Sequence, residues 1–116
     1  MDKITLLTKK IVKFRSDRDW KQFHNFKDMS LSLILEAAEL MEHFQWKNAE
    51  EIDNYVKKHK KEISEELADI LYWVLIISYD LKIDISKEFI AKLKKNEKKY
   101  PINKSKGKHT KYKELQ

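Results

Sequence analysis

The chain has 116 residues, of which 41% are hydrophobic and 38% are charged, so its length and apolar content fit one domain with a modest core. It contains a single glycine and a single proline, too few for a turn-rich β-sheet protein or for a glycine loop that cradles phosphates. The absence of cysteine excludes disulfide bonds and thiolate metal sites. We therefore predict an all-α protein.

The formal net charge of +6 is unevenly distributed along the chain. Residues 92–116 hold ten lysines and two glutamates, a local charge of +8, whereas residues 1–91 carry a charge of −2. We interpret the C-terminal lysines either as a solvated basic tail or as a surface that contacts phosphates, on a nucleotide or on a polymer. A basic helical module that binds nucleic acid through this tail is therefore an alternative function.

The sequence has no pattern typical of a membrane or secreted protein. Its longest apolar run, Ile70 to Tyr79, is about half of the ~20 residues that a transmembrane helix needs. The first residues do not combine a basic start with the apolar stretch of a signal peptide. We expect a cytoplasmic protein.

Hydrophobic periodicity predicts the helices of the first half in chain order. Apolar residues at helical spacing indicate an amphipathic helix over residues 2–18. Residues 19–28 have no clear period and are rich in aromatic and polar side chains, which indicates a connecting segment. A second helix is expected from Ser30 to about Gln45, and the chain should reverse at residues 46–48.

The second half begins with a sequence typical of a helix start. Asn48, with Glu51 three residues later, predicts a capping box for a short third helix. A fourth helix should span about His59 to Leu81. It is apolar on nearly every side from Ile70 to Ile77, and a monomer of this size can hardly cover all of that surface. Part of it is therefore expected to contact another subunit.

The last predicted helix begins after Asp84 or Ser86, either of which can cap it, and continues to about Lys99. Pro101 cannot continue the helical hydrogen bonds and should end it. We thus expect a single all-α domain over residues 1–101 and a basic, partly flexible tail over residues 102–116.

Two pairs of carboxylates lie within the most apolar stretches of the chain. Glu36 and Glu39 form one pair, and Glu66 and Asp69 form the other. At a spacing of three residues, both members of a pair project from the same face of a helix. If two such helices pack together, four carboxylates meet, and the cost of burying them favours either protonation or a bound cation. We infer a metal site, although ordinary surface charges paired with lysines are the simpler reading.

An all-oxygen set of ligands suits Mg²⁺ first and Mn²⁺ second. The Glu-x-x-His motif of di-iron bundles is absent, since none of the four histidines has a glutamate three residues before it. A cation held by carboxylates can neutralise phosphate oxygens and orient a water molecule. Hydrolysis of a nucleotide phosphoanhydride is therefore the simplest reaction class, with a spare carboxylate as general base.

Several sequence segments together resemble the MazG-like all-α nucleotide pyrophosphohydrolases, in particular their dCTP-pyrophosphatase branch. The order and spacing of these segments carry the resemblance, and together they span most of the chain. They are Phe14-Arg15 with Arg18-Asp-Trp-Lys-Gln-Phe-His24, Ser32-Leu33 through Glu36-Ala-Ala-Glu39-Leu40 to Phe44-Gln45-Trp46, Glu65-Glu66-Leu-Ala-Asp69-Ile-Leu-Tyr72, and Lys92-x-x-x-Asn96-x-x-Lys99-Tyr100-Pro101.

The resemblance implies a four-helix-bundle-like catalytic domain that cleaves a (deoxy)nucleoside triphosphate, dCTP-like or modified, between its α and β phosphates. It implies that the catalytic carboxylates of the two pairs hold Mg²⁺. It also nominates Trp20, His24 and Trp46 for the base and sugar pocket, although core packing or a structural hydrogen bond would explain them equally simply.

The family further implies that groups on the last helix contact the triphosphate, which nominates Lys92, Asn96 and Tyr100. An exposed helix face is the alternative for these residues. The family also forms dimers or dimer-derived tetramers, which agrees with the apolar surface expected at Ile70–Ile77. We therefore predict at least a homodimer that acts on a nucleoside triphosphate and binds neither membranes nor, as its main function, nucleic acid.

Overall fold

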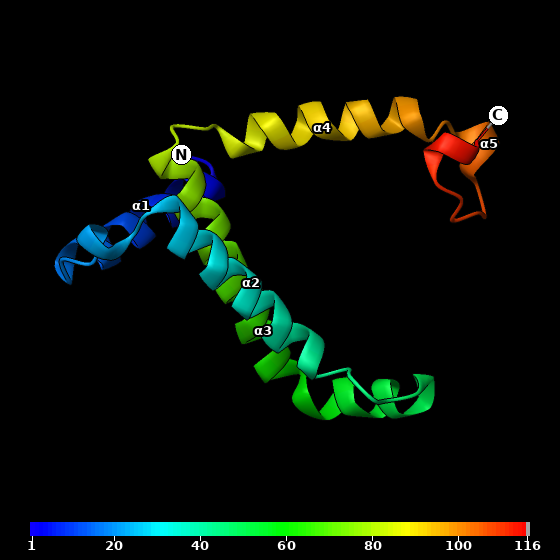
Figure 1. Ribbon diagram of the computed structural model, residues 1–116, viewed down its shortest axis with the longest axis horizontal. Helices are drawn as coiled ribbons and strands as arrows, with labels where there is room; N and C mark the ends of the chain where they lie inside the picture. Colours follow the sequence, from blue (N-terminus) through cyan, green and yellow to red (C-terminus); the bar gives the residue numbers. More distant parts are fainter. Residues whose placement is uncertain (116) are drawn as a thin grey trace. The chain divides into compact units, whose positions relative to one another are not determined.

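The computed structural model describes residues 1–115 (Figure 1). All regular elements within this range are α-helices or 3₁₀ turns, which confirms the all-α prediction. The elements fall into two compact units, residues 1–82 and the residues from Ile83 onward, and each is described by itself. Within the described range, no helix is both long enough and apolar enough to cross a bilayer.

The first unit is built on a pair of antiparallel helices, α2 (Phe26–Glu42) and α3 (Ala49–Asp80). They lie side by side over most of the length of α2, and α1 (Lys3–Asp17) packs against α3 (Figure 1). The fully buried side chains are Met29 on α2 and Leu75 and Ile76 on α3. Burying a side chain of this size contributes about 1.5–3 kcal/mol, so this small core holds the two helices together.

The start of α2 differs from the prediction by four residues. Helix α2 begins at Phe26, whereas periodicity indicated Ser30. The Asn25 side chain accepts a hydrogen bond from the backbone N–H of Asp28 at 2.8 Å, which satisfies one of the free donors at the helix end. This cap adds a turn to the helix, and the predicted connecting segment is therefore shorter and includes a 3₁₀ turn, η1 (Lys21–Phe23).

The predicted capping box is confirmed at the start of α3. The Asn48 side chain accepts from the N–H of Glu51 at 2.9 Å, and the Glu51 carboxylate accepts from the N–H of Asn48 at 3.2 Å. The residue two positions earlier, Trp46, has a left-handed backbone with φ of 68°, an uncommon conformation for a bulky residue. The chain reverses here, as expected.

The third and fourth predicted helices are one element with a kink at His59. The backbone there leaves the helical region, with φ of −119° and ψ of 23°. The His59 ring Nδ1 lies 3.1 Å from the carbonyl oxygen of Tyr55, one turn earlier. A side chain that occupies a carbonyl of the helical ladder is a recognised cause of kinks. The predicted boundary at residue 59 is thus the position of this bend.

An ion pair joins α1 to the end of α3. The guanidinium of Arg15 donates two hydrogen bonds, each of 2.8 Å, to the two carboxylate oxygens of Asp80. Both side chains are largely buried, with exposed fractions of 3% and 11%. The guanidinium lowers the pKa of Asp80, and hydrogen bonding to Asp80 raises the pKa of Arg15, so both groups stay charged.

The second unit contains α4 (Ile85–Lys99), α5 (Ile102–Ser105) and a 3₁₀ turn, η2 (Tyr112–Glu114). Asp84 caps α4 by accepting from the N–H of Lys87, so the first of the two predicted caps is the one used. Helix α4 ends at Lys99 before Pro101, as predicted. The Tyr100 and Tyr112 rings meet edge to face at 6.1 Å, which connects the end of α4 to the following segment.

Candidate metal centre

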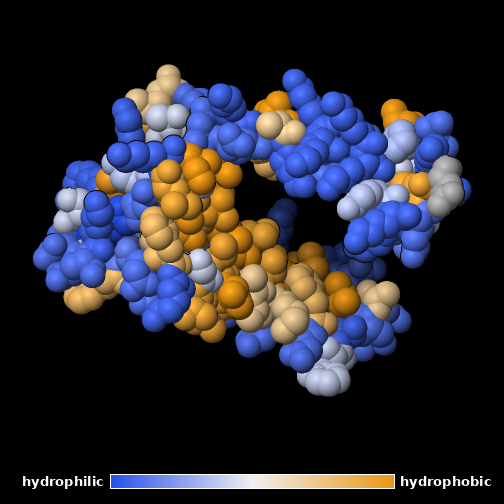
Figure 2. Space-filling view, turned by 45° about the horizontal axis from the view of Figure 1, so that its top comes forward, coloured by the Kyte–Doolittle hydropathy of each residue, from blue (hydrophilic) through white to orange (hydrophobic). Residues whose placement is uncertain are grey.

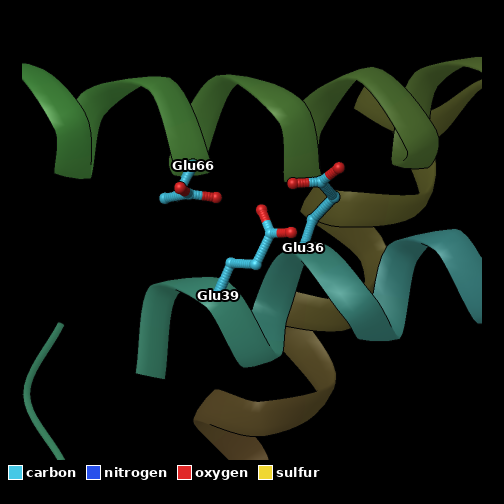
Figure 3. A group of neighbouring side chains, drawn as sticks. All are labelled: Glu36, Glu39 and Glu66. Carbon is cyan, nitrogen blue, oxygen red and sulfur yellow. The ribbon is translucent and has the colours of Figure 1, made fainter. Parts of the chain in front are cut away.

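Three glutamates from the two antiparallel helices converge on one point. Glu36 and Glu39 project from α2 toward α3, and Glu66 projects from α3 toward α2 (Figure 3). One carboxylate oxygen of each residue lies within 4.8 Å of the others. Glu36 and Glu66 are half-buried between the helices, whereas Glu39 is exposed. The cluster is therefore open to solvent on one side.

The crowding of negative charge changes the proton affinity of the cluster. Burial, together with the nearby Glu39, Asp69 and Glu66 carboxylates, raises the pKa of Glu36 to about 7. The adjacent Glu39 carboxylate, and then burial, raises the pKa of Glu66. The Oε2 atoms of Glu36 and Glu66 are buried and have no hydrogen-bond partner. Buried acceptors without partners are unfavourable unless a proton or a cation occupies the site.

Asp69 lies next to this cluster but is not one of its three central groups. It is exposed and stands one turn after Glu66 on α3. Its negative charge raises the pKa of both Glu36 and Glu66. Asp69 therefore adds to the negative charge of the cluster from its edge.

The donor set fits a hard divalent cation. A donor set made only of carboxylate oxygens suits Mg²⁺ and Mn²⁺, and the two unpartnered oxygens are free to coordinate. The exposed side leaves room for the water molecules that Mg²⁺ retains and for substrate oxygens. The residues present thus fit such an ion.

His43 is a neighbour of the cluster that the sequence reasoning did not nominate. It caps the C-terminal end of α2, and its Nε2 lies 3.8 Å from Oε1 of Glu66. Its Nδ1 lies 2.6 Å from the hydroxyl of Tyr55. The available signal was spacing, because His43 follows Glu39 by four residues and Glu36 by seven and so shares their helix face. Nothing in the sequence indicated Tyr55.

Trp20 and His24 belong to a second group of side chains, at the other end of α2. The His24 ring meets the Trp73 ring edge to face at 5.3 Å, and Trp20 meets Phe14 in the same way at 5.7 Å. Burial, and then the charge of Arg15, lowers the pKa of His24, so its ring is neutral at pH 7. The Nδ1 of His24 is buried without a hydrogen-bond partner.

The remaining nominated residues lie elsewhere. Trp46 is 91% exposed in the turn after α2. Helix α2 has 17 residues and is therefore about 25 Å long, and His24 and Trp46 lie beyond its opposite ends. Lys92 and Asn96 lie on α4 and Tyr100 is its C-cap, so all three belong to the second unit.

Comparisons with known proteins agree with this geometry. A family model described as the MazG-like family matches residues 31–115. The chain is 34% identical over 104 residues to dCTP pyrophosphatase 1 of Bos taurus, covering 88% of this chain and 62% of the relative, and 31% identical to that of Homo sapiens, covering 88% and 61%. The chain thus spans about three fifths of the length of these curated relatives.

A solved structure gives a match over nearly its full length. The crystal structure of a pyrophosphatase from Archaeoglobus fulgidus superposes with a TM-score of 0.82 at 32% sequence identity. The match covers 87% of this chain and 94% of that one. The predicted all-α MazG-type fold is therefore confirmed, and the chain belongs to the MazG-like family.

Proposed function

We propose that this protein is a Mg²⁺-dependent nucleoside triphosphate pyrophosphohydrolase that cleaves between the α and β phosphates and releases a monophosphate and pyrophosphate. The observation that carries the proposal is the convergence of Glu36, Glu39 and Glu66 within 4.8 Å, with two buried oxygens that lack partners. The names of the relatives support a dCTP-like substrate, which is the finer part of the proposal.

The four carboxylates would hold the ion, with Glu36 and Glu66 at the buried side and Glu39 and Asp69 toward solvent. When bound, Mg²⁺ supplies charge neutralisation at the phosphates and lowers the pKa of a coordinated water. The exposed carboxylates at the rim are placed to accept a proton from the attacking water. The half-buried pair, one residue from each helix, would hold the ion between α2 and α3.

We propose Trp20 and His24 for the nucleobase. A tryptophan ring offers a flat apolar face on which a base can stack, and the unpartnered Nδ1 of the neutral His24 ring can accept a hydrogen bond from an exocyclic amine. Cytosine carries such an amine, as do adenine and guanine, whereas thymine and uracil do not, so the choice of a dCTP-like base rests on the names of the relatives. We also propose Lys92, Asn96 and Tyr100 for the triphosphate, because an ammonium, an amide and a hydroxyl suit phosphate oxygens.

The active form is proposed to be a homodimer or a tetramer built from dimers. Hydrophobic side chains gather along the α2–α3 pair (Figure 2). On α2, Leu31, Ile34 and Leu35 share one face by their spacing and are all more than half exposed. Trp46 and His24 lie beyond opposite ends of α2, so a pocket that takes one of them from each of two chains would bring both to a single base. A second copy of this chain would therefore both cover the apolar face of α2 and complete the site.

Product analysis tests the proposed reaction. The full-length protein is incubated with a panel of triphosphates and Mg²⁺, and the released phosphorus species are identified. We expect pyrophosphate and a monophosphate, with dCTP among the best substrates, and loss of activity with a chelator. Release of orthophosphate, or turnover that survives chelation, would contradict the proposal.

Substitutions connect the reaction to the cluster. Glu39→Gln and Asp69→Asn should each reduce kcat/KM by more than about 100-fold. Each substitution preserves the shape of the side chain but removes the negative charge that would bind the ion. The matched control is Glu62→Gln, which changes an exposed carboxylate one turn before Glu66 on the same helix. Equal loss in the control would point to a general effect on the helix.

A further inference from the structure

His43 and Tyr55 form a contact that joins the end of α2 to the first segment of α3. The 2.6 Å separation between Nδ1 of His43 and the Tyr55 hydroxyl is a short hydrogen bond. On the other side of the imidazole, Nε2 lies 3.8 Å from Oε1 of Glu66. The side chains of His43 and Glu66 are only 15% and 19% exposed, so little water competes for this contact.

The partners on both sides determine which nitrogen of His43 carries the proton. An ionised Glu66 carboxylate can only accept, so Nε2 must be the protonated nitrogen when it faces that group. In the neutral imidazole Nδ1 is then an acceptor, and the Tyr55 hydroxyl donates to it. The Nε2–H then lies on the side of Glu66, 3.8 Å from Oε1 and beyond hydrogen-bond distance, and neither ring nitrogen of His43 is left free to coordinate a metal.

Two further side chains contact the ring of Tyr55. The His59 ring stacks on it at 3.9 Å with an angle of 16° between the planes. The Nζ of Lys47 lies 4.3 Å from the ring centroid, within the range of a cation–π contact. The kink at His59 thus turns the first segment of α3 and presents a rigid hydroxyl to His43.

We propose that His43 and Tyr55 are positioning residues for the metal centre: Tyr55 fixes the ring of His43, and the Nε2–H of His43 orients the Glu66 carboxylate toward the ion. The inference rests on the proposed function and adds two residues to its site. Outer groups that donate to a metal-binding side chain are a general means of orienting ligands. Such contacts are often long in the ligand-free state and shorten when the site is occupied.

Calorimetric titration of Mn²⁺ into the full-length, metal-free protein tests the proposal without turnover. We expect Tyr55→Phe and His43→Leu each to weaken Mn²⁺ binding by about 10- to 100-fold, the usual effect of losing an outer-shell partner. His43→Gln keeps a side-chain N–H near the position of Nε2 and should restore part of the affinity. The matched control, Tyr79→Phe, removes an exposed hydroxyl from the same helix and should leave the affinity unchanged.

A double-mutant cycle separates positioning from a general loss of structure. If Tyr55 acts through His43, Tyr55→Phe should have no further effect on Mn²⁺ affinity once His43 is leucine. Additive losses, or wild-type affinity in both single variants, would overturn the inference. A wild-type protein that binds no Mn²⁺ would instead overturn the proposed metal centre itself. Helical circular dichroism of each variant identifies any that fail to fold.

Discussion

At the scale of single residues, the raised pKa of Glu36 makes stability depend on pH. Its pKa is about 7 in the folded chain, against an ordinary value of 4.5. The folded state therefore holds this proton more tightly than the unfolded state. The ionisation cost is absent below about pH 4.5 and fully present above about pH 7, so stability falls as the pH rises between these values.

We predict that Glu36→Gln removes this cost in the metal-free protein. The melting temperature of the variant should exceed that of the wild type by at least about 4 °C at pH 8, and the difference should shrink toward pH 5. Adding Mg²⁺ should reverse the order at pH 8, because only the wild type retains all its ligands. Thermal scans at both pH values check this, and a difference independent of pH would contradict it.

At the scale of helices, the Arg15–Asp80 ion pair attaches α1 to α3. Removing one partner of a buried pair leaves the other charge without compensation, so Asp80→Asn should reduce the free energy of unfolding by about 3 kcal/mol. The control is Asp17→Asn, which breaks an exposed pair with Lys13 and should cost less than about 0.5 kcal/mol. Urea unfolding curves measure both, and similar values would show that burial adds nothing here.

The capping box of α3 allows a second test at this scale. Asn48→Ala should destabilise the protein by about 1 kcal/mol, because the N–H of Glu51 loses its acceptor. Asn54→Ala, at an exposed position inside the same helix, is the control and should be neutral or slightly stabilising. Urea unfolding curves of the two variants measure both changes in the free energy of unfolding. A larger loss in Asn54→Ala than in Asn48→Ala would contradict the role of the cap.

At the scale of the whole molecule, the exposed apolar face of α2 predicts self-association. Sedimentation at micromolar concentration should show a species of at least two chains. In Leu35→Glu the measured mass should fall toward that of one chain, and turnover should fall at least about tenfold. Leu35 is 63% exposed, so the substitution does not disturb the core. Ile102→Glu, at an exposed apolar position in α5, is the control and should leave the mass unchanged.

The features that the sequence predicted well depend on local spacing. The Asn48–Glu51 capping box and the end of α4 before Pro101 require only a few neighbouring residues. The meeting of Glu36 with Glu66 was also predictable, because acidic side chains within apolar helix stretches are expected to share a compensating cation. The burial of both pairs was not correct, since Glu39 and Asp69 are exposed. The role of each nominated residue stays a prediction that the experiments above address.

The features that were missed depend on polar side chains whose hydrogen bonds are not visible in the hydrophobic periodicity. The first turn of α2 was hidden because Asn25 caps it within an aromatic segment without periodicity. The contact between His43 and Tyr55 depends on the bend at His59, where a side chain replaces regular helical geometry. No hydrophobic period reports either event, since both are hydrogen bonds between polar groups.

Together with the proposed substrate role of Trp46, its left-handed backbone predicts a compromise between folding and activity. A residue with a Cβ in this conformation costs roughly 1–2 kcal/mol relative to glycine, and the ring recovers none of it because it lies in solvent. Trp46→Gly should therefore raise the free energy of unfolding by about 1 kcal/mol while it lowers kcat/KM. Urea unfolding and enzyme kinetics on the same preparation measure the gain in stability and the loss in kcat/KM. A more stable variant with undiminished kcat/KM would mean that this indole does not serve the substrate.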